Sequence, residues 1–424
     1  MSRFPVLSNA GKSVPASIFA KLREHLARFP GDVIPLQIGD THLRPPVALE
    51  DFGWGDAAEL YTYGSPAGYA PLLEAIATKA RDKNRLAITE ACIQIACGAT
   101  HALSCAVQAL CDRGEELILV TPHWPLIKGM AVGHGVTPIE VPYGPDLGAL
   151  LEHAITPRTS AIYVATPNNP DGLMLTAAEV EAVAQVAAKH DLWILSDEVY
   201  EDYGYDAQHI SIATRPAASD RTVTVFSFAK SYAQAGLRVG YALAPEPVTA
   251  AIKKLVNHSV YNVPVAMQRA ALGALRTGTS FLAAARERYK AARDGARARL
   301  HAPAACPPGG AYLWVDFERW SGNDCMPVLE KVAEQACCSR PAARSATSAI
   351  ATRACASRVC PKTGSTRVSI ASTPCSRRGH DRQKRLRGSV PRSGCRVRSG
   401  DAGAAGARTR AVAERPRGDR ARDR

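Results

Sequence analysis

The stretch SFAKSYAQAGLRVGY, residues 227–241, contains the most informative side chains of this chain. It follows an apolar run, residues 222–226, that is typical of a buried strand. Lys230 comes just after the end of the predicted strand, and Arg238 follows eight residues later. A lysine amine in this position can form a Schiff base with an aldehyde, and an arginine can bind a phosphate. Because the Lys-x7-Arg spacing is loose and most lysines are solvated, this segment alone only suggests an aldehyde phosphate as ligand.

A second segment, IACGATHALSCAVQAL, starts at residue 95 and places Gly98, Ala99 and Thr100 between a short apolar run and a helical pattern. The N–H groups at the start of a helix, with a threonine hydroxyl beside them, can bind an anion. The same text also fits an ordinary strand-to-helix turn.

Two further segments place an aromatic ring and an amide after apolar runs. In LILVTPHWP, residues 117–125, Trp124 could stack on an aromatic ligand or fill core volume. His123 could line a ligand pocket or lie in a surface loop, and we expect the surface loop. In AIYVATPNNPDG, residues 161–172, Asn169 lies in a strong turn signal. Its amide could donate to a ligand oxygen or serve only the turn.

The segment LWILSDEVYED, residues 192–202, leads from apolar residues into Asp197, with Tyr200 three residues further on. A carboxylate at a buried strand end needs a cationic partner, and a protonated pyridine nitrogen would supply one. The alternative is an aspartate that caps the following helix.

All these candidates lie at the C-terminal end of an apolar strand, where open α/β sheets bind their ligands. Helical patterns separate the strands. One of them, residues 176–190, opens with Thr176 and Glu179 in capping-box spacing. This alternation predicts an α/β fold with a mainly parallel sheet flanked by helices.

The chain resembles the class I/II aminotransferases of the fold-type I pyridoxal-phosphate family over residues 30–335. The matching text, in the family's order, is YTYGSPAGY, GAT, TPHWP, PNNPDG, SDEVYED, SFAKSYAQAGLRVGY and PPGGAYLWVDF. The resemblance implies a large domain with the cofactor site and a smaller α+β domain. It also implies an L-amino acid and a 2-oxo acid as substrates, and a homodimer.

The resemblance also implies a role for each matching residue. Lys230 would be the Schiff-base lysine that moves the substrate proton, and Asp197 would pair with the pyridine nitrogen of pyridoxal 5'-phosphate. Asn169 and Tyr200 would bind the phenolate oxygen, and Trp124 would stack on the ring. The phosphate would be bound by Gly98, Ala99, Thr100, Ser227 and Arg238. Tyr63 would bind the phosphate of the neighbouring subunit, and Gly39 would lie near the substrate carboxylate.

Two positions depart from the family's usual text. Asp171 stands where NPTG has threonine, and Ala229 replaces the second serine of SxSK. Losing one hydroxyl at a charged phosphate is expected to weaken cofactor binding by about 1.5–3 kcal/mol. The same residues would also serve a β-eliminating C–S lyase or a synthase of this family.

The C-terminal residues 337–424 differ in composition from the rest. They contain 22 Lys and Arg against 5 Asp and Glu, whereas the whole chain has a formal net charge of +13, so the basic balance comes from this tail. The tail contains no Phe, Trp or Tyr, and so it cannot bury much core. A nucleic-acid arm is one interpretation of such a segment, but we do not expect it here.

An out-of-frame translation explains the tail better. In a shifted reading frame, each codon consists of the third base of one written codon and the first two bases of the next. With the third bases chosen freely, the codons of residues 337–347 can then encode LLAPGGAFGD, and those of residues 352–358 can encode ARLCFT. Both strings resemble the family's C-terminal text. Ala354 then stands where the family has the arginine that clamps the substrate carboxylate, and Arg353 and Arg367 lie in unrelated text. On this hypothesis the chain retains a cofactor site and lacks its clamp, which leaves catalytic impairment as an alternative.

The predicted organisation is residues 1–39 as the N-terminal segment of the small domain, 40–290 as the large domain, 291–336 as the start of the rest of the small domain, and 337–424 as a basic tail that is disordered or out of frame. The small domain is therefore expected to be defective or disordered at its C-terminal end. No stretch approaches the roughly 20 apolar residues of a membrane span. The start lacks the apolar core of a signal peptide, and the cysteines fit reduced core thiols, so a cytoplasmic location is expected. No Cys/His spacing indicates a metal site.

Overall fold

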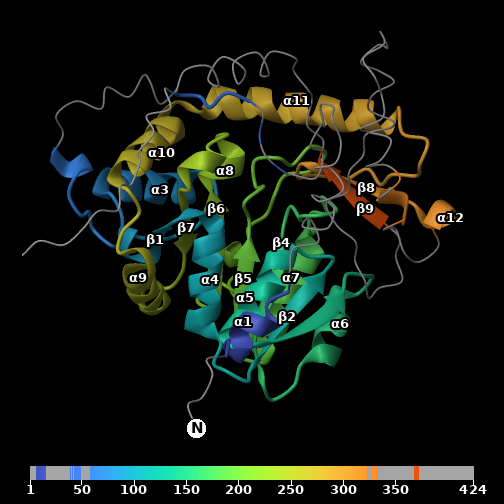
Figure 1. Ribbon diagram of the computed structural model, residues 1–424, viewed down its shortest axis with the longest axis horizontal. Coiled ribbons are helices and arrows are strands. Elements are labelled where there is room, and N and C mark those ends of the chain that lie inside the picture. The colour runs from blue at the N-terminus through green and yellow to red at the C-terminus, as the bar shows by residue number, and fades with distance from the viewer. Residues whose placement is uncertain are drawn as a thin grey trace, which may run out of the picture. The chain divides into compact units, whose positions relative to one another are not determined.

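Seven strands form one sheet in the order β1-β7-β6-β5-β4-β2-β3 (Figure 1). β7 runs antiparallel to both of its neighbours, and the other pairs are parallel. The strands are β1 (Ile93–Ala96), β2 (Glu116–Thr121), β3 (Thr137–Pro142), β4 (Thr159–Ala165), β5 (Trp193–Asp197), β6 (Thr222–Ser227) and β7 (Gly240–Leu243). The predicted α/β class with a mainly parallel sheet is therefore confirmed.

The computed structural model describes residues 6–15, 39, 41, 43–48, 58–321, 327–329 and 331, and the backbone of 367–371. Residues 1–375 belong to one unit, and residues 376–424, none of them described, belong to another. Most of the tail therefore lies outside the described residues, and the domain division at residue 290 stays a prediction.

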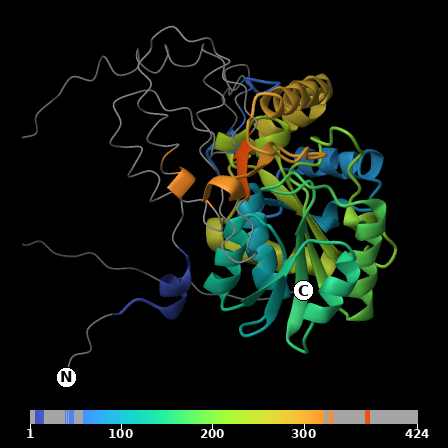
Figure 2. The same ribbon diagram turned by 90° about the vertical axis from the view of Figure 1, so that its right-hand side faces the viewer.

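Helices cover both faces of the sheet (Figures 1 and 2). One face packs against α4, α5 and α9, and the opposite face packs against α3 and α10 at one end and α6 and α7 at the other. These helices are α3 (Ala70–Asp82), α4 (Gly98–Leu110), α5 (Pro125–His134), α6 (Leu147–Ala154), α7 (Ala177–Lys189), α9 (Glu246–Val260) and α10 (Val265–Thr277).

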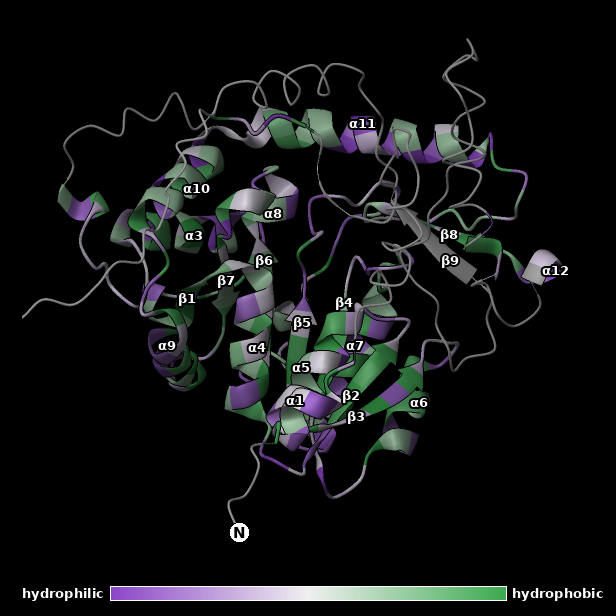
Figure 3. Ribbon diagram, viewed as in Figure 1, coloured by the Kyte–Doolittle hydropathy of each residue, from purple (hydrophilic) through white to green (hydrophobic). Residues whose placement is uncertain are grey.

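The two faces follow from the alternation of side chains along each strand. In β2, Leu117 and Leu119 join the core under α4, whereas Ile118 joins the core under α6 and α7. Because both faces are buried, the strands are apolar at successive positions (Figure 3). α7 begins at the predicted capping box, in which Thr176 and Glu179 bond each other's backbone N–H groups.

A long helix, α11 (Thr279–Arg297), follows α10. A second sheet pairs β8 (Tyr312–Asp316) with β9 (Arg367–Ala371) in antiparallel register. Short elements complete the described part: α1 (Asn9–Ser13), α8 (Phe228–Ser231), α12 (Glu318–Ser321) and the 3₁₀ turns 58–60, 90–92, 212–214 and 235–237. No helix in the described residues is long and apolar enough to cross a membrane.

Candidate active site

Lys230 lies in α8, a single helical turn that starts directly after β6. Its amine donates a hydrogen bond to the backbone carbonyl of Gly39 and lies 6.0 Å from the ring centroid of Tyr200. Tyr203 donates a 2.8 Å hydrogen bond to the backbone carbonyl of Lys230. The structure thus brings together three residues that the sequence assigns to the site: Lys230, Gly39 and Tyr200.

Asp197 is the last residue of β5, the strand beside β6, and it is buried. Its Oδ2 accepts a 3.0 Å hydrogen bond from the hydroxyl of Tyr163, and its Oδ1 accepts one of 3.3 Å from the N–H of Val199. Burial raises the pKa of the Asp197 carboxyl to about 6, against the opposing effect of these bonds and of Lys230. A buried carboxylate in this state fits a cationic ligand group such as a pyridinium nitrogen.

The start of α4 and Arg238 form a close-packed corner. Gly98 has φ of +78°, and a Cβ placed there would lie 2.5 Å from Nη2 of Arg238. A Cβ on Gly240 would lie 2.6 Å from the N atom of Ala99. Glycine is required at both positions, and the guanidinium group lies against the first residues of a helix, where an anion is favoured. This arrangement fits the phosphate of the cofactor.

Ser227 and Thr100 are the other two residues that the sequence analysis assigned to the phosphate. Ser227 is the N-cap of α8, and its Oγ accepts a 3.1 Å hydrogen bond from the N–H of Ala229. Thr100 lies in the first turn of α4. Their contacts with a phosphate stay a prediction.

Asn169 and Tyr200 converge on a residue to which the sequence assigned no role. The Asn169 amide donates a 3.1 Å hydrogen bond to the hydroxyl of Tyr312, and the Tyr200 hydroxyl lies 3.0 Å from the same oxygen. Tyr312 belongs to β8, and no local pattern in PPGGAYLWVDF indicates that its hydroxyl reaches this site. The neighbouring Asn168 bonds the Pro122 carbonyl and Asp171, and so it serves the turn.

Trp124 is the N-cap of α5, half-buried, and it packs against the core under α4. The side chain of His123 is only 8% exposed, and its Nε2 lies 3.3 Å from Glu140. The expected surface position of His123 was therefore wrong, although His123 does lie in the loop between β2 and α5. Its partner is Glu140 of β3, whose side chain is 27% exposed.

Tyr63 is 82% exposed, and its ring centroid lies 4.5 Å from that of Tyr261. Tyr261 is not among the residues assigned to the site. An exposed position is what a side chain needs if it serves a neighbouring subunit.

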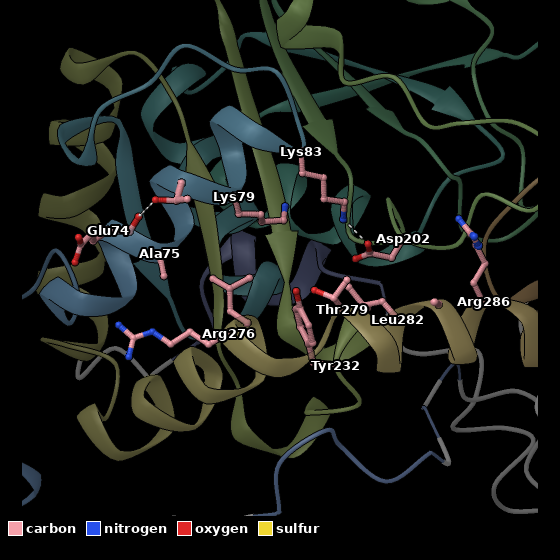
Figure 4. Close-up of a pocket in the computed structure, with 13 residues that line it drawn as sticks. Glu74, Ala75, Lys79, Lys83, Asp202, Tyr232, Arg276, Thr279, Leu282 and Arg286 are labelled. Atoms are coloured by element: carbon pink, nitrogen blue, oxygen red, sulfur yellow. Dashed lines mark hydrogen bonds and ion pairs between the residues drawn. The ribbon is translucent and has the colours of Figure 1, made fainter.

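A pocket of about 710 Å³ lies elsewhere, between α3, α10 and α11 (Figure 4). Lys79, Lys83 and Asp202 line one wall, and Lys83 is ion-paired with Asp202. Its lining contains none of the residues that the sequence assigns to the site. This pocket is therefore separate from the residues assigned to the candidate active site.

Comparison with known proteins agrees with this geometry. The model of the family described as aminotransferase class I and II matches residues 31–376. An aspartate/prephenate aminotransferase from Thermus thermophilus is 33% identical over 316 residues, which span 72% of this chain and 81% of that protein. An arginine–pyruvate transaminase from Pseudomonas aeruginosa is 31% identical over 296 residues, 68% of this chain and 75% of that protein.

Solved structures show the same fold. An aspartate aminotransferase from Thermus thermophilus with maleate has a TM-score of 0.75 and 27% identity, covering 88% of this chain and 96% of that chain. An N-succinyldiaminopimelate aminotransferase from Mycobacterium tuberculosis has a TM-score of 0.72 and 25% identity, covering 87% of this chain. The chain belongs to the class I and II aminotransferase family. Its activity class is that of a pyridoxal-phosphate-dependent transaminase.

Proposed function

We propose that this chain transfers an amino group between an L-amino acid and a 2-oxo acid at the edge of the sheet where β5 and β6 end. The placement of Lys230 and Asp197 at the ends of these two adjacent parallel strands carries the proposal. Bound pyridoxal phosphate would supply an aldehyde and a ring that stabilises negative charge at the substrate Cα. The amine of Lys230 would hold and return the proton of that carbon atom.

The other residues bind and orient in this proposal. Asp197 would keep the pyridine nitrogen protonated, because a buried carboxylate favours a cation beside it. Asn169 and Tyr200 would donate to the phenolate oxygen, and Trp124 would pack on the ring. The phosphate would be held by Gly98, Ala99, Thr100, Ser227 and Arg238.

The assembly we propose is a homodimer. Tyr61, Tyr63 and Tyr261 are 84%, 82% and 49% exposed, and large aromatic side chains on a surface are typical of an interface. Tyr63 would reach the phosphate in the neighbouring subunit. A cytoplasmic location is also proposed, and it is supported by the described cysteines, which are free thiols.

The frameshift hypothesis adds a condition to this function. The family match extends to residue 376, beyond the position near 336 where the family-like text ends in the written sequence. β9, which includes Arg367, is described only by its backbone, so the role of its side chain lies outside the description. Sequencing the coding DNA across codons 330–345 tests the hypothesis. An unbroken frame without alternative LLAPGGAF-like text would rule it out.

The visible absorption spectrum of the purified protein with pyridoxal phosphate, before and after addition of L-amino acids, tests the function. We expect a band that depends on Lys230 and changes on addition of an amino acid, with formation of a 2-oxo acid. The matched control is Lys253→Ala, which removes an exposed lysine on α9.

Each other outcome has a distinct meaning. Release of pyruvate and ammonia without a 2-oxo acid co-substrate would indicate a C–S lyase. A band that forms without responding would indicate a cofactor-binding protein that lacks its carboxylate clamp. A band that survives in Lys230→Ala would contradict the proposed site.

A further inference from the structure

We propose that Tyr312 is a positioning residue of the cofactor site, which orients the hydroxyl of Tyr200 toward the phenolate oxygen of pyridoxal phosphate. This inference rests on the proposed function. Tyr312 lies on β8, outside the seven-stranded sheet that positions the other site residues, and is 5% exposed. Its hydroxyl bonds the side chains of Asn169 and Tyr200 and packs against Gly39.

The direction of the hydrogen bonds supports this role. The amide of Asn169 donates to the Tyr312 oxygen at 3.1 Å, so that oxygen acts as an acceptor on one side. The Tyr312 proton can then be donated to the Tyr200 oxygen, 3.0 Å away. In this arrangement the Tyr200 proton points away from Tyr312, and the phenolate oxygen of the cofactor is a suitable acceptor for it. Hydrogen bonds in such a chain strengthen one another in a buried site.

The packing holds this geometry in place. The rings of Tyr200 and Tyr312 meet edge to face, with centroids 5.9 Å apart and an interplanar angle of 79°. A Cβ at Gly39 would lie 1.8 Å from the Tyr312 hydroxyl oxygen. Glycine at position 39 therefore provides the space that the Tyr312 hydroxyl needs, and the carbonyl of the same residue accepts the hydrogen bond of Lys230.

The experiment is a pH titration of the visible absorbance of bound cofactor in the full-length protein and in Tyr312→Phe, Tyr200→Phe and the double variant. Loss of a correctly aimed donor disfavours the deprotonated chromophore, so we expect the midpoint to rise in Tyr312→Phe by up to about one unit. We expect a larger rise in Tyr200→Phe. The double variant should match Tyr200→Phe, because Tyr312 acts through Tyr200.

Tyr205→Phe is the matched control, because its hydroxyl donates to the Gly310 carbonyl and makes no hydrogen bond with Asn169 or Tyr200. An unchanged midpoint in Tyr312→Phe, or additive shifts in the double variant, would overturn the inference even if the melting temperature falls. Loss of the band in a folded Tyr312→Phe would also overturn it, because Tyr312 would then hold the cofactor directly. Absence of a band in the unmodified protein would instead contradict the proposed function.

Discussion

The hydroxyl of Tyr163 and the carboxylate of Asp197 form a 3.0 Å hydrogen bond between the adjacent strands β4 and β5, and both side chains are buried. Burial nevertheless raises the pKa of Asp197 to about 6 from an ordinary value of 3.8. The hydrogen bonds from Tyr163 and Val199 and the charge of Lys230 thus do not compensate for the lost solvation of the carboxylate. This carboxylate costs stability in the protein without cofactor.

The first prediction concerns the pH dependence of that cost. Since the folded-state pKa is raised, the contribution of Asp197 to stability is full below about pH 4 and is lost as the pH rises through about 6. We compare the unfolding free energy of Asp197→Asn with that of the unmodified protein, both without cofactor. Between pH 4 and pH 7 this difference should shift in favour of Asp197→Asn by about 2–3 kcal/mol. Urea unfolding at several pH values measures this. A difference that does not vary with pH would contradict it.

The second prediction uses two glycines with left-handed backbone. Gly98 and Gly114 have φ of +78° and +91°, but a Cβ at Gly114 meets nothing within 4 Å, whereas one at Gly98 would displace Arg238. Both alanine variants should lose about 1–2 kcal/mol of stability from backbone strain. Only Gly98→Ala should also lose cofactor affinity, by tenfold or more as estimated for about one charge-assisted hydrogen bond. Equal affinities in a titration with pyridoxal phosphate would exclude a phosphate site at this corner.

The third prediction concerns a buried ion network at the pocket between α3, α10 and α11. Glu201 accepts hydrogen bonds of 2.5 Å from both Lys79 and Asn84, and the Lys79 and Glu201 side chains are 10% and 4% exposed. Burial alone would raise the pKa of Glu201, but the charges of Lys79 and Lys83 lower it to about 2. This contribution to stability is therefore present above about pH 4.5 and is lost as the pH falls toward 2.

Lys79→Met would leave the Glu201 charge buried without its main partner, at a cost of about 3–5 kcal/mol at pH 7. Lys79→Met combined with Glu201→Gln should recover part of this loss. Urea unfolding of the double variant and of each single variant measures these losses of unfolding free energy. If the loss in the double variant equals the sum of the two single losses, the network is not coupled as we describe.

The fourth prediction tests the role of Tyr63 across subunits. A mixture of Tyr63→Ala and Lys230→Ala subunits forms hybrid dimers in which one site has both native residues, provided that Tyr63 serves its neighbour. After co-refolding, the mixture should regain about a quarter of the activity of the unmodified protein, by random pairing in a symmetric dimer. The separate variants serve as controls. If the mixture is no more active than its components, Tyr63 acts within its own subunit or not at all.

The sequence predicted much of the sheet and the residues at its edge, because polar residues at the ends of parallel strands meet at one edge. Lys230, Asp197 and Tyr200 could be identified in this way. Tyr312 could not, because it is 112 residues from Tyr200 and belongs to another sheet. Nor could the low exposure of His123, whose partner Glu140 belongs to a neighbouring strand. Contacts of this kind arise from tertiary packing, and the local polarity and periodicity of the sequence do not predict them.

The four-residue length of α8 has a consequence for the lysine amine. A helix of one turn cannot hold its own shape, because nucleation fixes several dihedral angles for one hydrogen bond. The position of Lys230 is therefore determined by contacts with residues outside α8. The Tyr203 hydroxyl donates to the carbonyl of Lys230, and the Val239 carbonyl accepts the N–H of Phe228. Removal of the Tyr203 hydroxyl should therefore misplace the Lys230 amine, although this hydroxyl bonds the lysine backbone and not a ligand.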